Sequence, residues 1–387
     1  MSAFSTQVRS TLDELSLMLR PAGGGIFTVS TGHAEQEALQ RALYQAPDAG
    51  AVNTLWRAAL ARIEQATVVV LGIPSDCGAG LIRGAAYGPQ GVRAAVLRRR
   101  PDYPALAARL GIIDAGDVFV VPQLLADDML DARQIAATRA AIYGGDVRAA
   151  ALPVAPLSIA EAVCDRVLAL NASARLLMLG GDHSVAWPVV AALARHAREP
   201  WAIVHADAHT DLLPDRLGVR ICFATWAYHA NELVGRGGRL VQVGVRASAR
   251  PRAHWEETLG VRQFWMDDVR ARGEAAVIDE IVAHVRALGV RRVYFSNDID
   301  GTDAAAAPST GAPAGDGLSV AFVRALIARL GQAFLLIGGD VVEVAPPVGS
   351  PEDAKRTTDV AACYMLETLA ALTGDRTFRP EGDAESK

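Results

Sequence analysis

The chain is poor in cysteine, and its few cysteines lie far apart. Among its 387 residues only four are cysteines, and none forms a Cys-x-x-Cys pair. This spacing argues against a structural zinc site and against a disulfide framework. The sequence therefore predicts a protein of a reducing compartment, and we expect it in the cytoplasm.

The chain also lacks a long apolar run and a concentration of positive charge. No uncharged apolar run of about 18 residues occurs, and the N-terminus lacks a basic segment followed by an apolar core. Lys and Arg number 38 against 43 Asp and Glu, for a net charge of -5. We expect no membrane partner and no nucleic-acid partner, because neither an apolar span nor a basic footprint is present.

Apolar runs alternate with helical patterns along most of the chain. Continuous apolar runs at residues 176–179, 201–204, 293–295 and 334–337 suit buried strands of a parallel sheet, and further strands are expected at 66–71 and 240–245. Helical patterns lie between them, at 89–99, 158–170, 275–288, 319–330 and 357–372, and Ser158 is expected to open a capping box. The alternation predicts an α/β fold with right-handed crossovers and helices on both faces of the sheet.

The ends of the chain differ from this pattern. Residues 1–62 are expected to form an N-terminal helical extension, which packs on the core or on a neighbouring subunit. Its two helical signals, at 10–19 and 34–44, are separated by residues 21–25, which we interpret as a flexible turn. The catalytic domain is expected over residues 63–376, followed by a flexible C-terminal tail at 377–387.

Four polar clusters follow apolar runs, at residues 181–184, 207–211, 298–300 and 343. In parallel sheets, ligands gather at the carboxyl ends of the strands. Asp207, His209 and Asp211 alternate at a period of two, so an extended backbone would place all three on one face. A single such cluster would be explained as well by helix caps or loop charges.

Together the clusters supply six candidate metal ligands: His183, Asp207, His209, Asp211, Asp298 and Asp300. Four carboxylates in one cleft would repel one another strongly without a cation. They exceed the needs of one tetrahedral zinc and suit two hard cations, with manganese favoured and iron, cobalt or nickel possible. Two metals that share a water generate hydroxide near neutral pH, so the site predicts a hydrolase.

The clusters also resemble the arginase and agmatinase family of ureohydrolases. The matching segments are residues 180–184, 207–211, 296–301 and 339–344, and the opening segment 72–78 and the loop 307–313 are similar to agmatinase-type sequences. The resemblance spans about residues 67–372. It implies a three-layer α-β-α fold with a central, mostly parallel sheet, two Mn²⁺ ions, and a homo-oligomer, either a trimer or a hexamer.

The resemblance also implies roles for single residues. His183 and Asp211 would hold one ion, His209 and Asp300 the other, and Asp207 and Asp298 would bridge them. Asp211 would also orient the bridging hydroxide, which attacks the guanidinium carbon of a small guanidino compound and releases urea and an amine. Glu343 would pair with the guanidinium; alternatively it caps a turn before Pro346.

The chain departs from the family where a histidine usually shuttles protons to the leaving amine. Phe223 stands at that position, with Cys222 beside it. His229 is the nearest substitute, although a histidine next to Tyr228 is also typical of an ordinary, partly buried residue. Loss of a positioned general acid costs about 10² to 10⁴-fold in rate.

The loop before Phe223 carries two arginines, Arg216 and Arg220. An arginine there could clamp a substrate carboxylate in a bidentate way, or it could be a solvated loop charge. Agmatine-like and carboxylated guanidines both remain open as substrates.

Other functions must be weighed against a guanidino hydrolase. A deacetylase-like enzyme of the same fold class would need a single zinc site and typically a histidine pair near the metal. Asp298, Asp300 and Glu343 argue against it. An amidine or deacylase-type hydrolase on the same fold is a further alternative to the deacetylase-like enzyme. A catalytically weak paralogue that acts as a binding or assembly subunit is suggested by the missing histidine and opposed by the complete ligand set.

Overall fold

The computed structural model describes residues 3–26 and 32–378, and within them the chain forms a nine-stranded sheet. The spatial order is β1-β3-β2-β4-β9-β8-β5-β6-β7, and every pair is parallel except β1 with β3. The strands are β1 Leu19–Arg20, β2 Val68–Ile73, β3 Ile112–Val118, β4 Arg175–Gly180, β5 Trp201–Ala206, β6 Leu240–Val245, β7 Arg262–Trp265, β8 Arg292–Asn297 and β9 Leu335–Val341.

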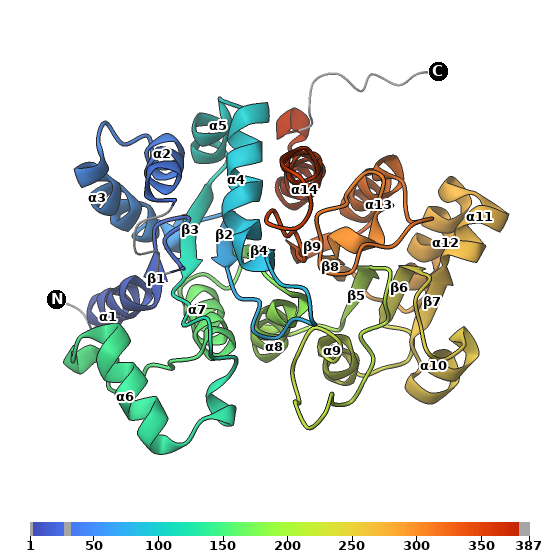
Figure 1. The fold of residues 1–387 in the computed structure, drawn as a ribbon, viewed down its shortest axis with the longest axis horizontal. Helices are drawn as coiled ribbons and strands as arrows, with labels where there is room; N and C mark the ends of the chain where they lie inside the picture. Colours follow the sequence, from blue (N-terminus) through green and yellow to red (C-terminus); the bar gives the residue numbers. More distant parts are fainter. Residues whose placement is uncertain (1–2, 27–31, 379–387) are drawn as a thin grey trace.

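Helices cover both faces of the sheet, which gives three layers (Figure 1). On one face lie α2 His33–Tyr44, α4 Gly88–Arg99, α5 Tyr103–Arg109, α11 Met266–Arg272, α12 Glu274–Ala287, α13 Val320–Ala333 and α14 Pro351–Thr373. On the other lie α1 Ala3–Met18, α7 Pro156–Leu170, α8 Ala186–His196, α9 Trp226–Val234 and α10 Arg252–Leu259. Each face has its own buried apolar cluster, and the predicted three-layer α-β-α architecture is confirmed.

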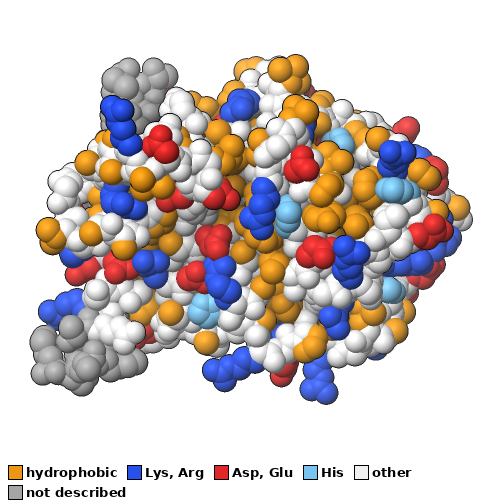
Figure 2. All heavy atoms as spheres, turned by 90° about the horizontal axis from the view of Figure 1, so that it is seen from below, with side chains coloured by type: hydrophobic (Ala, Val, Ile, Leu, Met, Phe, Trp, Pro, Cys, Tyr) orange, Lys and Arg blue, Asp and Glu red, His pale blue; other side chains and the backbone are white. Residues whose placement is uncertain are grey.

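Two elements lie toward the β1 and β3 edge: α3 Ala49–Leu60 and α6 Ala132–Tyr143 (Figure 1). On the molecular face of Figure 2, cationic and anionic side chains are interspersed, in keeping with the small net charge of -5. Across the described ranges, no helix has both the length and the apolar composition needed to cross a membrane.

Some local expectations from sequence were wrong. The helix expected to open with a capping box at Ser158 begins two residues earlier, at Pro156, with no side-chain cap at Ala155. Proline is well suited to a first helical turn, because its missing N–H has no partner to lose there. The Ser158 hydroxyl instead accepts a hydrogen bond from the Asp127 backbone N–H at 2.9 Å.

The N-terminal segment packs directly on the sheet. β1 pairs antiparallel with β3, so that Leu19 lies opposite Val118. Trp56 of α3 is 1% exposed, and its indole N–H donates to the Ala115 carbonyl oxygen of β3 at 2.9 Å. The helices expected at 10–19 and 34–44 correspond to α1 and α2. Through these contacts, residues 3–26 and 32–62 share a buried apolar core with the sheet.

The turn at residues 21–25 is packed rather than flexible, so the sequence interpretation was wrong. Gly23 N–H donates to the buried Asp117 carboxylate at 2.7 Å. A Cβ atom at Gly25 would lie 2.5 Å from the Val118 carbonyl oxygen, so only glycine allows this close approach. At the other end, Phe378 is fully buried and packs against Tyr103, while residues 379–387 of the predicted tail lie outside the described ranges.

Candidate metal centre

The four polar clusters lie at the carboxyl ends of β4, β5, β8 and β9, as expected for a parallel sheet. These strands are neighbours in the order β4-β9-β8-β5, so their ends meet at one edge. His183 lies in a 3-10 turn after β4, and Asp300 lies in another after β8. The sheet topology therefore brings segments that are far apart in sequence to one place.

Turns, and not an extended strand, orient the acids. Residues 208 and 209 form a bend and Asp211 has a left-handed backbone, with φ of 51°, so the extended backbone expected for residues 207–211 was wrong. Asp298 caps the 3-10 turn that follows it by accepting from the Asp300 N–H at 2.8 Å. Asp298 thus serves as a cap through one carboxylate oxygen and keeps the other free to face a ligand.

A first group of ligand atoms surrounds His183 Nδ1. This atom lies 3.3 Å from Asp207 Oδ2, 3.3 Å from Asp211 Oδ2 and 3.0 Å from Asp298 Oδ2. His183 Nδ1 is buried and has no hydrogen-bond partner among the described residues. A buried nitrogen without a partner that faces three carboxylates suits a metal ion, because both donor types ligate divalent cations.

A second group of ligand atoms surrounds His209 Nδ1. It lies 3.4 Å from Asp207 Oδ1 and 3.1 Å from Asp300 Oδ2. Asp207 therefore turns one oxygen toward each group, which is the geometry of a bridging carboxylate. The side chain of His209 is 35% exposed whereas Asp207 and Asp300 are buried, so the second group lies closer to solvent.

The electrostatics of the two groups call for added positive charge. Burial raises the pKa of Asp298 well above its usual value, and the charges of Asp300 and Asp207 add to this effect. Burial opposes protonation of His209, yet its hydrogen bonds to Asp207 and Asp300 raise its pKa to about 12. Positive charge at these two groups would relieve the repulsion of the crowded carboxylates, and divalent cations would supply it.

A buried hydrogen-bond network fixes which His183 nitrogen faces the carboxylates. His183 Nε2 lies 3.0 Å from Ser296 Oγ, and Ser296 Oγ donates its single proton to the buried carboxylate of Asp340 at 2.9 Å. Ser296 must therefore accept from His183 Nε2–H. Nδ1 is left as the atom at which a proton and a metal ion compete.

A third histidine, His205, was missed by the sequence analysis and holds the Asp207 carboxylate. His205 Nε2 lies 2.7 Å from Asp207 Oδ2, and its Nδ1 lies 3.0 Å from Gln242 Nε2. Gln263 Nε2 donates to Gln242 Oε1 at 2.7 Å, and Trp265 Nε1 donates to Gln263 Oε1 at 2.9 Å. An indole N–H can only donate, so Gln263 must accept from Trp265 through its oxygen and donate through its nitrogen. The same reasoning makes Gln242 donate to Nδ1 of His205, and His205 therefore donates from Nε2 to Asp207.

These polar side chains form one row across the sheet. Ser296 lies opposite His205, His205 opposite Gln242, and Gln242 opposite Gln263 in the registers of β8, β5, β6 and β7. The row is buried and contacts the two groups of ligand atoms through His183 and Asp207. The available signal in the sequence was a histidine or glutamine inside an otherwise apolar strand, which must have a partner when it is buried.

Glu343 lies beside the first group without joining it. Its backbone is left-handed, with φ of 61°, and its Oε1 accepts from the His183 backbone N–H at 2.9 Å. Its other oxygen faces the loop 307–313, since a Cβ atom at Gly311 would lie 3.7 Å from Glu343 Oε2. Burial raises the pKa of Glu343 well above its usual value, and the charge of Asp182 adds to this.

The Trp226 side chain of α9 contacts the centre, whereas the histidine expected from sequence on the same helix does not. Trp226 Nε1 donates to Asp211 Oδ2 at 3.0 Å, and its ring stacks on that of His183 with centroids 4.6 Å apart. His229, on the same helix, lies with its Nε2 3.0 Å from the Pro214 carbonyl oxygen and 3.1 Å from that of Arg220. His229 therefore faces backbone carbonyls, and its role in proton transfer stays a prediction.

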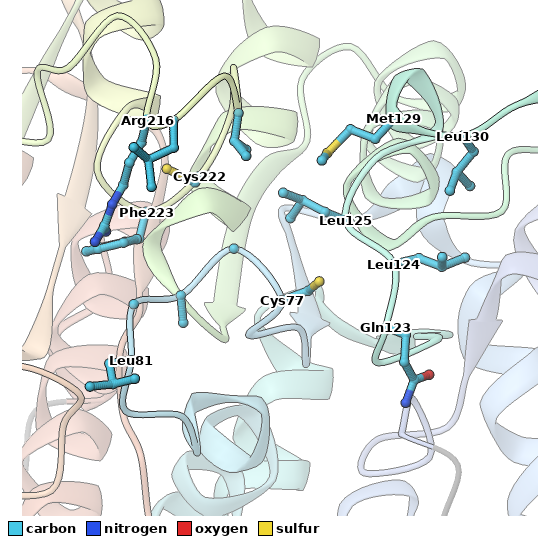
Figure 3. Close-up of a pocket in the computed structure, with 15 residues that line it drawn as sticks. Cys77, Leu81, Gln123, Leu124, Leu125, Met129, Leu130, Arg216, Cys222 and Phe223 are labelled. Carbon is cyan, nitrogen blue, oxygen red and sulfur yellow. The ribbon is translucent and has the colours of Figure 1, made fainter.

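A cavity of about 600 Å³ opens at the same edge of the sheet (Figure 3). Its walls come from the loops after β2, β3 and β5. Phe223, where the sequence analysis expected a histidine, lines it together with Cys222 and Arg216. The Phe223 N–H donates to the Gly78 carbonyl oxygen, and the Gly78 N–H donates to Asp182, which precedes the candidate ligand His183. Hydrogen bonds thus connect the cavity wall to the segment that carries the first group of ligand atoms.

Comparisons with known proteins agree with this geometry. A sequence profile of the arginase family matches residues 66–371. The chain is 31% identical to the agmatinase of Chromobacterium violaceum over 326 residues, covering 82% of this chain and 88% of that protein. It is 29% identical to the guanidinobutyrase of Pseudomonas aeruginosa over 323 residues, covering 81% and 89%. The solved structure of proclavaminate amidino hydrolase from Streptomyces clavuligerus superposes with a TM-score of 0.62 at 29% identity, covering 80% of this chain and 92% of that one.

Proposed function

The chain belongs to the arginase family of hydrolases, and we propose that it splits a small guanidino compound into urea and an amine at a centre of two manganese ions. The single observation that carries this proposal is the bridging position of Asp207, whose two oxygens face two separate groups of ligand atoms. The names of the relatives, agmatinase and guanidinobutyrase, support a guanidino substrate.

One ion would be held by His183, Asp207, Asp211 and Asp298, and the other by His209, Asp207 and Asp300, with Asp298 as a second bridge. Mixed imidazole and carboxylate donors favour manganese, and iron, cobalt or nickel are the next candidates. Two bound divalent ions would supply Lewis acidity and a nucleophile near neutral pH.

The side chains around the centre would bind and orient the substrate. We propose that Glu343 pairs with the guanidinium, because Oε1 is anchored by the His183 N–H and Oε2 faces the loop 307–313. A cation beside Glu343 would offset the burial that raises its pKa. Asp211, which accepts a hydrogen bond from Trp226, would orient the nucleophile.

Phe223 supports a second candidate, a weak catalyst that serves as a binding or assembly subunit. A phenyl ring cannot pass a proton to the leaving amine, so turnover is expected to fall by about 10² to 10⁴-fold unless the substrate has an easier leaving group. His229 remains the proposed substitute, with the reservation that its Nε2 faces two carbonyl oxygens.

The proposal is tested by loading metal-free protein with manganese, measuring the metal stoichiometry, and assaying urea release from a panel of guanidino compounds. We expect two ions per chain and urea from at least one compound. Asp298→Ala should lose metal and turnover together. Asp303→Asn, in the next turn, keeps its contact to the Ala305 N–H and should retain both.

Two results would contradict the proposal: full activity without any divalent metal, or two tightly held ions in Asp298→Ala. Two bound ions with no urea from any compound would favour the binding or assembly subunit instead.

We further propose a catalytic domain over residues 63–376 with an N-terminal extension at 1–62, and a homo-oligomer of three or six chains in the cytoplasm. All four cysteines are free, as suits a reducing compartment. Light scattering on the purified protein distinguishes a monomer from a trimer or hexamer.

A further inference from the structure

The cavity beside the candidate metal centre has a mostly apolar wall, and one cationic side chain, that of Arg216, lines it. Figure 3 shows Arg216 alongside Phe223 on one side, with Leu125 and Met129 on the opposite side. Fifteen residues line the cavity, and none of them is acidic. A cavity of about 600 Å³ is large enough for a bulky organic group.

Arg216 lines the cavity, and its guanidinium stacks on the Phe223 ring. It lies 4.7 Å above the centre of the Phe223 ring, which holds the side chain against the wall. Within the described ranges no carboxylate forms an ion pair with it. The neighbouring Asp215 accepts instead from the Gly218 N–H at 3.2 Å. The main chain of Arg216 is fixed as well, because it exchanges two hydrogen bonds with Val219.

Arg220, on the same loop, is placed differently. Its guanidinium lies 5.4 Å from the centre of the Trp187 ring, on α8, and Arg220 does not line the cavity. The sequence offered both arginines as candidates for a substrate carboxylate, and only Arg216 reaches the cavity. Arg83 adds positive charge nearby, since its guanidinium donates to the Cys77 carbonyl oxygen at 3.5 Å.

We propose that the substrate is a guanidino acid whose alkyl or aryl body fills this cavity and whose carboxylate pairs with Arg216. This inference rests on the proposed function and names the substrate class for the same site. A planar guanidinium forms paired hydrogen bonds with a carboxylate. A substrate with a terminal ammonium would meet Arg216 as a like charge and would find no acid in the cavity wall.

The test compares three guanidines with the same aryl body, ending in a carboxylate, a neutral amide or an ammonium group. We expect the highest kcat/KM for the carboxylate. Arg216→Ala should lower kcat/KM for the carboxylate by about ten- to a hundredfold, mainly through KM, and leave the amide almost unchanged. Arg216→Glu should reverse the preference between carboxylate and ammonium. Arg220→Ala is the matched control and should behave like the wild type.

A preference for the ammonium compound in the wild type, or equal effects of Arg216→Ala and Arg220→Ala, would overturn the proposal. A binding measurement separates it from the proposed function. The same aryl carboxylate without its guanidine should bind the manganese-loaded wild type by calorimetry, and bind Arg216→Ala at least tenfold more weakly. Equal binding to both proteins also overturns the inference. Absence of urea from all compounds, with this binding difference intact, counts against the hydrolase and not against the carboxylate site.

Discussion

His183 and His205 have adjacent rings, with centroids 4.9 Å apart, but their hydrogen bonds give them different roles. Ser296 accepts from the Nε2 proton of His183, so the Nδ1 lone pair of His183 faces the carboxylates. Gln242 donates to Nδ1 of His205, so His205 donates from Nε2 to Asp207. One imidazole is thus prepared to ligate, and the other holds a ligand in place.

This difference predicts a loss of metal affinity when His205 is replaced. His205→Leu removes the donor to Asp207 and should weaken manganese binding by about ten- to a hundredfold, as is usual for residues that orient a ligand. Competition with a fluorescent chelator measures the affinity. Gln263→Leu, two hydrogen bonds further away, should have a much smaller effect. Unchanged affinity in His205→Leu would mean that the turn alone positions Asp207.

The thiol of Cys77 provides a prediction about pH. Burial raises its pKa, and the nearby Arg83 only partly opposes this. Because the thiolate is the reactive form, a raised pKa leaves less of it at neutral pH. We expect Cys77 to alkylate more slowly than a free thiol at pH 7 and to accelerate as the pH rises. Mass spectrometry of labelled peptides over a pH series checks this, and fast labelling at pH 7 would contradict it.

At the scale of elements, the sequence predicted the strands that end in polar clusters but did not predict β1, β3 and β7. Apolar runs followed by polar clusters predicted β4, β5, β8 and β9. The order of these strands in the sheet brings all six candidate ligands to one place. β3 contains Asp114 and Asp117, which pair with the buried Arg93, so its pattern is not continuously apolar. β7 has four residues and β1 has two, too few for a periodic signal.

The same limit applies to the site. The turn conformations of Asp211 and Glu343, and the contact of Trp226 with Asp211, depend on tertiary packing that no local pattern encodes. The polar residues of the row across the sheet follow no spacing along the chain, because their neighbours come from different strands. Sequence reasoning could therefore name the candidate ligands but not the residues that hold them.

The N-terminal helices can be tested as elements of the core. Trp56→Ala removes a buried ring and the hydrogen bond to Ala115, and should lower the free energy of unfolding by about 3–5 kcal/mol. Leu55→Ala, one residue away and 37% exposed, is the matched control and should have a small effect. Urea unfolding monitored by circular dichroism measures both. An equal effect of the two variants would show that α3 contributes little to the core.

For the whole molecule, metal binding and folding should be coupled. The carboxylates of Asp207, Asp211, Asp298 and Asp300 are buried close together, so the folded protein without metal bears their repulsion. A ligand that binds only the folded state stabilises it by about 2.7 kcal/mol at 100 times its Kd. We expect the Tm to rise steadily with manganese concentration. Asp298→Ala should lose most of this dependence, and a Tm that ignores manganese in the wild type would contradict the coupling.

The sheet order also has a consequence for synthesis. β9 is the last strand to leave the ribosome, yet it lies between β4 and β8 and joins the two halves of the sheet. His183 belongs to the half made first, whereas Asp207 and Asp298 belong to the other half. A nascent chain that stops before Leu335 therefore cannot assemble the centre, and we expect a metal ion to enter only after translation is almost complete.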